Sequence, residues 1–209
     1  MNTILFDGKN SFFDYNLILL SKTIGFPETR KTAVEIPGMD GELDFTEFFG
    51  SPNFSNRTLI FSFAIKSNVF DNYSNVINAL HGSSCKIVLN EDPYWHYVGR
   101  IAVSDLTVTK GIGYVTITCD CEPWKLSEEK KCVVTVSGSS DVKIRSYRKP
   151  TIPKISTTGE ITIQYGSFSW SVSAGDDITI PDLVFAEGTN VLTITGTATV
   201  VLSYVWGKL

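Results

Sequence analysis

Three acidic residues stand at every second position, Asp40, Glu42 and Asp44, in a stretch that also holds several glycines and phenylalanines. A helix-loop-helix calcium site needs acids at loop positions one, three and five, glycine at six and glutamate at twelve. The acids fit, but Phe45 stands where the glycine should be and Ser51 where the glutamate should be. Because the match fails, we interpret the stretch as a solvated acidic loop or strand edge, and a non-standard calcium site and a joint with another copy of the chain stay open as alternatives.

Two pairs of adjacent acids, Glu91 with Asp92 and Asp176 with Asp177, could in principle carry out general acid–base chemistry. That chemistry needs two carboxyl groups in different environments, one of them with a pKa raised by burial. Both pairs lie in stretches typical of turns, LNEDPYW and SAGDDIT, where carboxylates bond the local backbone. We therefore interpret both pairs as turn residues.

The cysteines and histidines could in principle assemble a zinc site. Cys119 and Cys121 share one face of an expected strand, but the two-residue spacing between paired cysteines that zinc knuckles use is absent. We therefore expect buried, small hydrophobic cysteines that remain free thiols in a reducing compartment. The full set consists of Cys85, Cys119, Cys121, Cys132, His81 and His96.

The sequence shows no arrangement for nucleophilic catalysis or phosphate binding. It has no serine in a G-x-S-x-G elbow, no P-loop and no G-x-G-x-x-G. A basic run contains one aromatic residue, Tyr147, rather than the interleaved series of single-strand binders, and it fits solvent-facing or guarded edge strands. We predict no catalytic, cofactor-binding or metal residues, no cofactor and no enzyme activity. The basic run consists of Lys143, Arg145, Arg148, Lys149 and Lys154.

Composition indicates a folded chain with two domains. Its 209 residues exceed the roughly 100 to 150 of one domain, and 43% are hydrophobic against 19% charged. A net charge of -4 and a pI near 5.2 disfavour binding to nucleic acid or to an anionic membrane surface. The first twenty residues lack a basic n-region, and no apolar run reaches the ~20 residues of a membrane-spanning helix.

The periodicity of apolar residues along the chain is that of short strands, and it predicts a mainly β fold. Alternating apolar residues predict strands at Arg57–Ile65 and at residues 85–89, 97–106 and 113–121. One segment, residues 70–80, has a 3.6-residue period closed by Gly82, which predicts the single helix.

A proline- and charge-rich stretch, residues 122–131, predicts a linker between domains 1–125 and 126–209. The second domain shows short strands with turns between them, typical of a β-sandwich or jelly roll. We expect its turns at Gly166, Gly175, Gly188 and Gly196. The expected strands are residues 160–165, Phe168–Val172, 177–180, 190–195 and 199–206.

The order of several short segments resembles the distal tail protein family of long-tailed phages and prophages of Gram-positive bacteria. The segments are ILFDG at 4–8, IPGMDGELD at 36–44, NRTL at 56–59, LHG at 80–82, EDPYWHYVGR at 91–100 and CEPWK at 121–125. The C-terminal segments GTN at 188–190, Gly196 and SYVWGKL at 203–209 continue the series.

The resemblance implies an N-terminal β-sandwich-like ring domain with one α-helix and a C-terminal galectin-like β-sandwich. It also implies a hexameric hub at the distal tail end that joins the tail tube to tip or baseplate proteins. Such a virion protein would be made in the cytoplasm of the bacterial host. As a virion structural protein, it would need no cofactor.

Residues 126–209 depart from what a lectin needs, because they contain no histidine and only one asparagine, Asn190. We therefore do not expect this domain to bind carbohydrate, and we expect Trp170 and Trp206 in its core. The alternative function is a monomeric carbohydrate-binding adhesin of the tail tip. It would use exposed aromatic residues in the stretch from Tyr94 to Tyr97.

Overall fold

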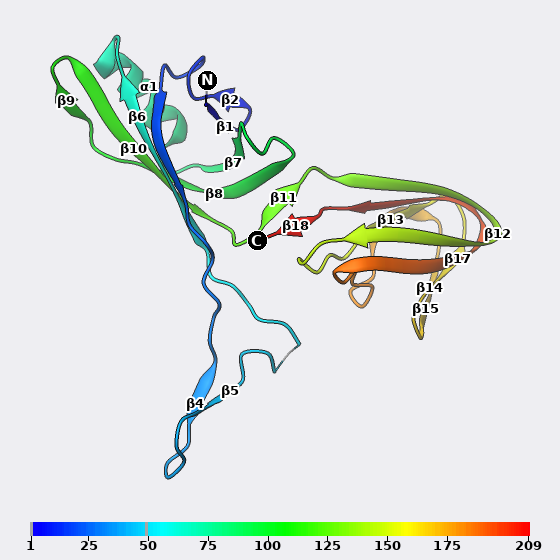
Figure 1. Ribbon diagram of the computed structural model, residues 1–209. Helices are drawn as coiled ribbons and strands as arrows, with labels where there is room; N and C mark the ends of the chain where they lie inside the picture. Colours follow the sequence, from blue (N-terminus) through cyan, green and yellow to red (C-terminus); the bar gives the residue numbers. More distant parts are fainter. Residues whose placement is uncertain (1, 49) are drawn as a thin grey trace. The chain divides into compact units, whose positions relative to one another are not determined.

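The computed structural model describes residues 2–48 and 50–209 (Figure 1). The chain divides into two compact units, Met1–Lys125 and Leu126–Leu209, and each has its own hydrophobic core. The predicted mainly β fold is confirmed, since one helix accompanies the strands within the described ranges. That helix is too short to cross a lipid bilayer, and the described residues include none longer.

Unit 1 contains an antiparallel sheet with the strand order β2-β1-β7-β8-β10-β6-β3. Strand β6 shows why these residues form strands: Leu59, Phe61 and Phe63 point into the core, and the residues between them do not. All four predicted strands of this unit are confirmed, with ends shifted by up to three residues. The strands are β1 (Ile4–Phe6), β2 (Lys9–Asn10), β3 (Ile18–Ile24), β6 (Arg57–Ile65), β7 (Ser84–Leu89), β8 (Trp95–Val103), β9 (Thr107–Thr109) and β10 (Ile112–Cys121).

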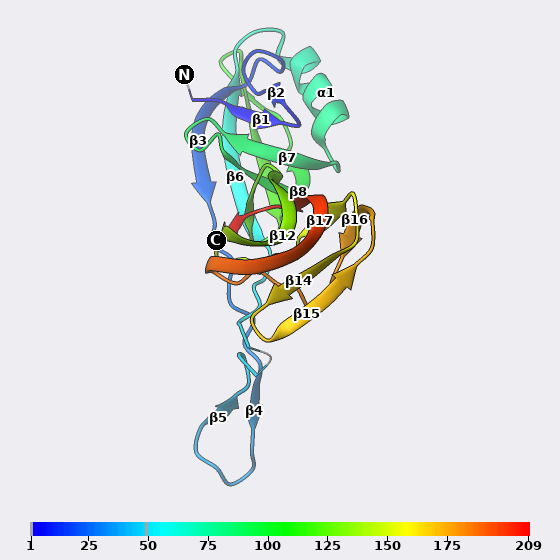
Figure 2. The ribbon, with the colours of Figure 1, turned by 90° about the vertical axis from the view of Figure 1, so that its right-hand side faces the viewer.

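The predicted helix is α1 (Val69–Leu80), which lies beside the strands of this sheet (Figure 2). Val76 and Leu80 are its buried residues and join the core of unit 1. The helix ends as expected, because the His81 amide donates to the Ile77 carbonyl and Gly82 adopts a φ of 78°. The Gly82 amide then donates to the Ile101 carbonyl on β8 at 2.8 Å.

Unit 2 is organised around one long strand, β17 (Gly188–Tyr204). Strand β12 (Lys130–Ser146) pairs with β17 over its full length. On the other edge of β17, β14 (Ile161–Tyr165) pairs with the first half and β13 (Lys154–Thr157) with the second. The outer strands are β15 (Phe168–Val172) beside β14 and β16 (Gly175–Thr179) beside β13.

The prediction of two strands separated by a turn at Gly196 is wrong, because β17 continues through that residue. Gly196 lies opposite Gly138 of β12, and both have positive φ, 146° and 91°. Two facing residues in this conformation let both strands bend at the same point. Every second side chain on both strands faces the same core, so the bend lays one half of the paired strands over the other (Figure 1).

The prediction of a linker over residues 122–131 is also wrong in part. The stretch contains β11 (Lys125–Ser127), and β12 already begins at Lys130. The Ser127 side chain is buried, and its amide donates to the Trp206 carbonyl at 2.9 Å, next to β18 (Gly207–Lys208). The charged residues signalled an exposed stretch, whereas the strand within it depends on the bond between Ser127 and Trp206, a residue distant in the sequence.

Candidate functional site

The most distinctive feature of unit 1 is an arm, residues 25–56, that connects β3 to β6 (Figure 1). Its two halves run side by side. The Gly25 amide donates to the Thr58 carbonyl at 2.9 Å, Arg30 to Asn53 at 2.8 Å and Phe45 to Thr32 at 2.7 Å. Further out, β4 (Ala33–Glu35) and β5 (Glu42–Asp44) form a separate two-stranded sheet.

The outer arm is amphipathic. In the ribbon formed by β4 and β5, Val34 pairs with Leu43. Because side chains alternate along a strand, these two side chains lie on one face of the ribbon and those of the neighbouring pairs lie on the other. The other face carries the pairs Ala33 with Asp44 and Glu35 with Glu42. Val34 is 49% exposed and Leu43 38%, so the apolar face of the ribbon lies open to solvent.

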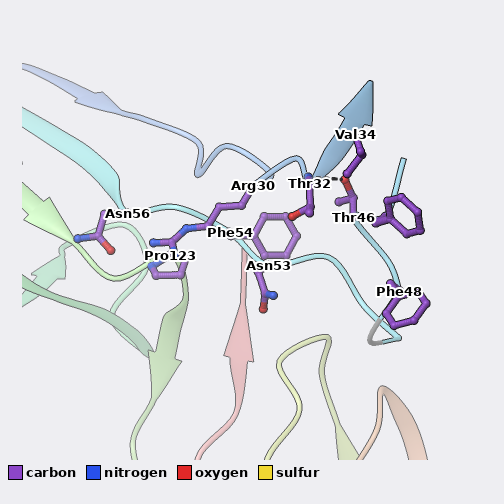
Figure 3. Close-up of a pocket in the computed structure, with 10 residues that line it drawn as sticks. Arg30, Thr32, Val34, Thr46, Phe48, Asn53, Phe54, Asn56 and Pro123 are labelled. Atoms are coloured by element: carbon purple, nitrogen blue, oxygen red, sulfur yellow. Dashed lines mark hydrogen bonds between the residues drawn. The ribbon is translucent and has the colours of Figure 1, made fainter. Parts of the chain in front are cut away.

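A groove of about 640 Å³ runs along the arm (Figure 3). Three phenylalanines contribute to its lining, and Phe45 packs edge-on against Phe48 with ring centroids 6.0 Å apart. At the base, Phe54 packs edge-on against Trp124, with centroids 5.5 Å apart, which ties the arm to the end of unit 1. The lining residues are Arg30, Thr32, Val34, Phe45, Thr46, Phe48, Asn53, Phe54, Asn56 and Pro123.

Segments that carried the sequence resemblance meet near the base of the arm. Arg57, from NRTL, pairs across the strands with Cys121, from CEPWK, and its guanidinium lies 5.4 Å from the centre of the Tyr97 ring. The Lys125 ammonium lies 2.7 Å from an Asp92 oxygen and 5.9 Å from the centre of the Trp95 ring. These contacts therefore hold together the strand ends from which the arm extends.

The three alternating acids lie on the arm, but they do not form a metal site with other described residues. Asp40 is exposed in the turn at the tip, while Glu42 and Asp44 belong to β5. A hydrogen bond with Thr46 lowers the pKa of Asp44 below its ordinary value. Their spacing places Glu42 and Asp44 together on the polar face of the ribbon.

Three of the six cysteines and histidines lie near one another on the buried face of the unit 1 sheet, because Cys85 and Cys121 flank Gly99 on neighbouring strands and Cys119 precedes Cys121 by two residues. The described residues nevertheless form no group that could hold a metal ion. Cys85, Cys119 and Cys121 are buried free thiols in unit 1, and Cys132 is a free thiol in unit 2. Burial raises the pKa of the Cys121 thiol to about 12, and burial also raises the pKa of the Cys119 thiol. His81 accepts a hydrogen bond from the Val103 amide at 3.0 Å through Nδ1. These groups act as packing and backbone-bonding residues.

The two carboxylate pairs belong to different units. Glu91 and Asp92 occupy the predicted turn, where Glu91 pairs with Lys22 and Asp92 with Lys125. The turn predicted at Asp176 and Asp177 is wrong, since both residues lie in strand β16. None of the four carboxyl groups is buried, so neither pair offers the two different environments that acid–base chemistry needs.

Two expectations about aromatic residues need correction. Trp170 and Trp206 are half-buried: Trp170 packs against the core of unit 2 and stacks on exposed Phe168, while Trp206 donates from Nε1 to the Arg145 carbonyl at 2.7 Å. Tyr97 is buried, whereas Tyr94 is 81% exposed. Of the three aromatic residues that the adhesin alternative would use, Tyr94, Trp95 and Tyr97, the last is therefore not exposed.

The basic run of unit 2 stays largely in solvent. Lys143 and Arg145 point outward from β12, and Lys154 points outward from β13. Arg148 is also exposed, and Lys149 is half-buried. The run therefore covers an outer surface, as the sequence predicted.

Sequence reasoning missed the amphipathic arm, although the signal was present. Residues 42–45 alternate acid and apolar, which is the strand period, and Val34 precedes an expected turn at Pro37 and Gly38. Buried Arg57 gave no local signal, because the aromatic ring beneath it comes from a strand forty residues further along the chain.

The fold is that of a phage distal tail protein. Among solved structures, the chain is similar to Dit (gp 19.1) of phage SPP1, over 100% of both chains, with a TM-score of 0.71 and 18% sequence identity. That protein is described as a paradigm of the hub adsorption apparatus in phages that infect Gram-positive bacteria. The sequence resemblance is thereby confirmed at the level of the fold. No protein-family model and no curated protein sequence matches the chain.

Proposed function

We propose that the chain is a structural subunit of a phage tail that forms a hexameric hub at the distal end. The hub would join the tail tube to tip or baseplate proteins, and it would be made in the host cytoplasm before entering the virion. The observation that carries this proposal is the fold similarity to a hub protein over the whole of both chains. Fold alone does not establish function, so the surfaces of the chain must also suit assembly.

The arm is the surface best suited to a contact between subunits. An isolated two-stranded ribbon is marginally stable in water, and exposed apolar side chains favour burial in an interface. Val34, Leu43 and Phe45 lie exposed on this ribbon. In a closed ring each subunit offers two different surfaces, one to each neighbour, and the arm would be one of them.

The proposed role requires no turnover. The described lining of the groove in Figure 3 contains none of the acids, thiols and histidines named by the sequence. The groove lining instead consists of aromatic, aliphatic, amide and hydroxyl side chains with one cation, Arg30. Such a lining is typical of a contact surface.

Immunogold labelling of intact tailed particles tests the position of the protein. Antibodies raised against the purified chain should place gold at the tail end remote from the capsid. Antibodies against the tail tube protein serve as the control and should label along the tail. Gold along the tube or at the capsid would contradict the proposed hub.

A further inference from the structure

Strand β15 forms one edge of the unit 2 sheet, outside β14 (Figure 2). The two strands pair over their whole length without a bulge, from Ile161 opposite Val172 to Tyr165 opposite Phe168. No other described strand pairs with β15. An edge strand presents a row of N–H and C=O groups that no neighbouring strand bonds, and these groups can accept a further strand.

The register identifies the backbone groups on the free edge of β15. A two-residue turn at 166–167 joins the strands, so Tyr165 and Phe168, which close it, form a hydrogen-bonded pair. Along an antiparallel ladder such pairs alternate with pairs that exchange no backbone bonds. The N–H and C=O groups of Ser169 and Ser171 therefore point away from β14, and both residues are exposed.

The other outer strands described for unit 2 are protected against pairing, and β15 is not. Strand β12 carries Lys143 and Arg145 on exposed positions, and β16 carries Asp176 and Asp177 and pairs with β13 through a register shift. Charges and irregularities of this kind keep edge strands from adding a further strand. Residues 161–175 contain no charge and no proline. Strand β17 is also uncharged, but it is paired on both edges.

Two aromatic side chains of β15 would be covered by an added strand. Phe168 and Trp170 stack with ring centroids 5.9 Å apart, on the same side of the strand as buried Val172. Phe168 is 62% exposed, and Trp170 is half-buried. An apolar side chain of an added strand would pack against these rings, while its polar neighbours would stay in water.

We infer that the free edge of β15 binds an extended segment of another tail protein, one in which apolar and uncharged polar residues alternate. Strand addition of this kind obtains affinity from main-chain hydrogen bonds and selectivity from alternate side chains. The choice of a different protein rests on the proposed function. Copies in a closed ring meet through unlike surfaces, whereas β15 pairing with β15 of a second copy needs a two-fold axis and would join two hubs.

The probe is a synthetic peptide, EITIQY, that copies residues 160–165. These residues already pair with β15 on its other edge, so their alternation of apolar and polar side chains suits the strand. Titration of the fluorescently labelled peptide with the full chain gives the affinity by anisotropy. Hydrogen–deuterium exchange of the complex, followed by mass spectrometry, locates the site. A peptide of the same composition, with its apolar residues placed together, is the control.

Three variants of the full chain separate the backbone from the side chains. Ser171→Pro removes an N–H that points away from β14, so the pairing of β14 with β15 is kept. Ser171→Ala keeps this N–H and loses only the hydroxyl, which makes it the matched control. Phe168→Lys places a charge at the exposed aromatic position and keeps the test decisive if the proline variant does not fold. Circular dichroism and thermal unfolding establish which variants are folded.

We expect EITIQY to slow the amide exchange of Phe168–Val172 and to bind Ser171→Ala like the unaltered chain. Ser171→Pro and Phe168→Lys should each weaken binding by about tenfold. Absence of binding, protection elsewhere in the chain, or equal binding of the control peptide or of all variants would overturn the inference.

The mass of the chain in solution separates this inference from the proposed function. An unaltered chain with twice the mass of Ser171→Pro would show that β15 pairs with β15 of a second copy, and it would overturn the choice of partner. A chain that never assembles would remove the proposed function, whereas failure of the peptide to bind would overturn the strand addition and leave the hub standing.

Discussion

At the scale of single residues, the buried side-chain amide of Asn190 makes four hydrogen bonds in unit 2. Its oxygen accepts from the Tyr165 hydroxyl at 2.6 Å and from the Ala186 amide at 3.0 Å. Its nitrogen donates to the Ala186 carbonyl at 2.9 Å and to the Ile144 carbonyl at 3.3 Å. The one asparagine of this unit therefore has a structural role, since its side chain bonds groups of the unit itself.

Replacing this asparagine should cost about 3 kcal/mol of unfolding free energy, because Asn190→Ala leaves several buried polar groups without a partner. Urea unfolding of the full chain measures the loss. Thr189→Ala, at the exposed neighbouring position on β17, should change stability by no more than about 0.5 kcal/mol. Equal losses of unfolding free energy in the two variants would show that the hydrogen bonds of the Asn190 amide do not stabilise the unit.

The pair formed by Glu91 and Lys22 should make a small, pH-dependent contribution. The hydrogen bond from Lys22 lowers the pKa of Glu91 below its ordinary value of 4.5. A lowered pKa in the folded state adds stability above that ordinary value, and this stability is lost as the pH falls through the lowered pKa.

Glu91→Gln should therefore destabilise the chain at pH 7 by about 0.5 kcal/mol, a small effect because both side chains are partly exposed. Urea unfolding at pH 7 and at pH 3 should show this difference at the first pH and its disappearance at the second. Glu187→Gln, at an exposed position, is the control and should change little at either pH. A difference that persists at pH 3 would contradict the assigned ion pair.

At the scale of elements, the bend in β12 and β17 depends on two facing glycines in different surroundings. A Cβ at Gly196 would lie 2.8 Å from the Glu160 carbonyl oxygen, whereas a Cβ at Gly138 would meet open space. Gly138→Ala should cost about 1 kcal/mol from backbone strain alone, and Gly196→Ala about 3 kcal/mol from strain and collision together. Thermal unfolding compares the two; equal midpoints would contradict this account of the bend.

The sequence predicted elements well where a periodic pattern is local. Strand β6 and helix α1 were placed to within a residue, because their buried faces repeat every second residue or every 3.6 residues. Strand β17 was divided wrongly at Gly196, since a glycine usually marks a turn. Its strand conformation depends on pairing with Gly138, and a distant partner leaves no local signal.

The arm illustrates the same limit for the candidate site. Its acids suggested possible metal ligands. Their structural role depends on the pairing of β5 with β4, which places Glu42 and Asp44 on the face opposite Val34 and Leu43. The alternation of residues 42–45 was visible, but the register with residues 33–35 was not. The sequence thus located the site and left its role among three alternatives.

At the scale of the whole molecule, the proposed function depends on how the chain associates with other subunits. The full-length similarity to a hub protein gives the fold, and the arm gives an exposed apolar surface. Unlike surfaces on the same chain produce rings when the rotation between neighbours closes. The arm should therefore matter for assembly and have little effect on folding.

The most direct test is the mass of the purified chain in solution, measured by light scattering behind size exclusion over a range of concentrations and salts. Because the contact is mainly apolar, we expect the mass to change little with salt. The account predicts a mass near six times 23.1 kDa. A chain that stays at 23.1 kDa under every condition, and also in the presence of a tail tube or tip protein, would contradict it.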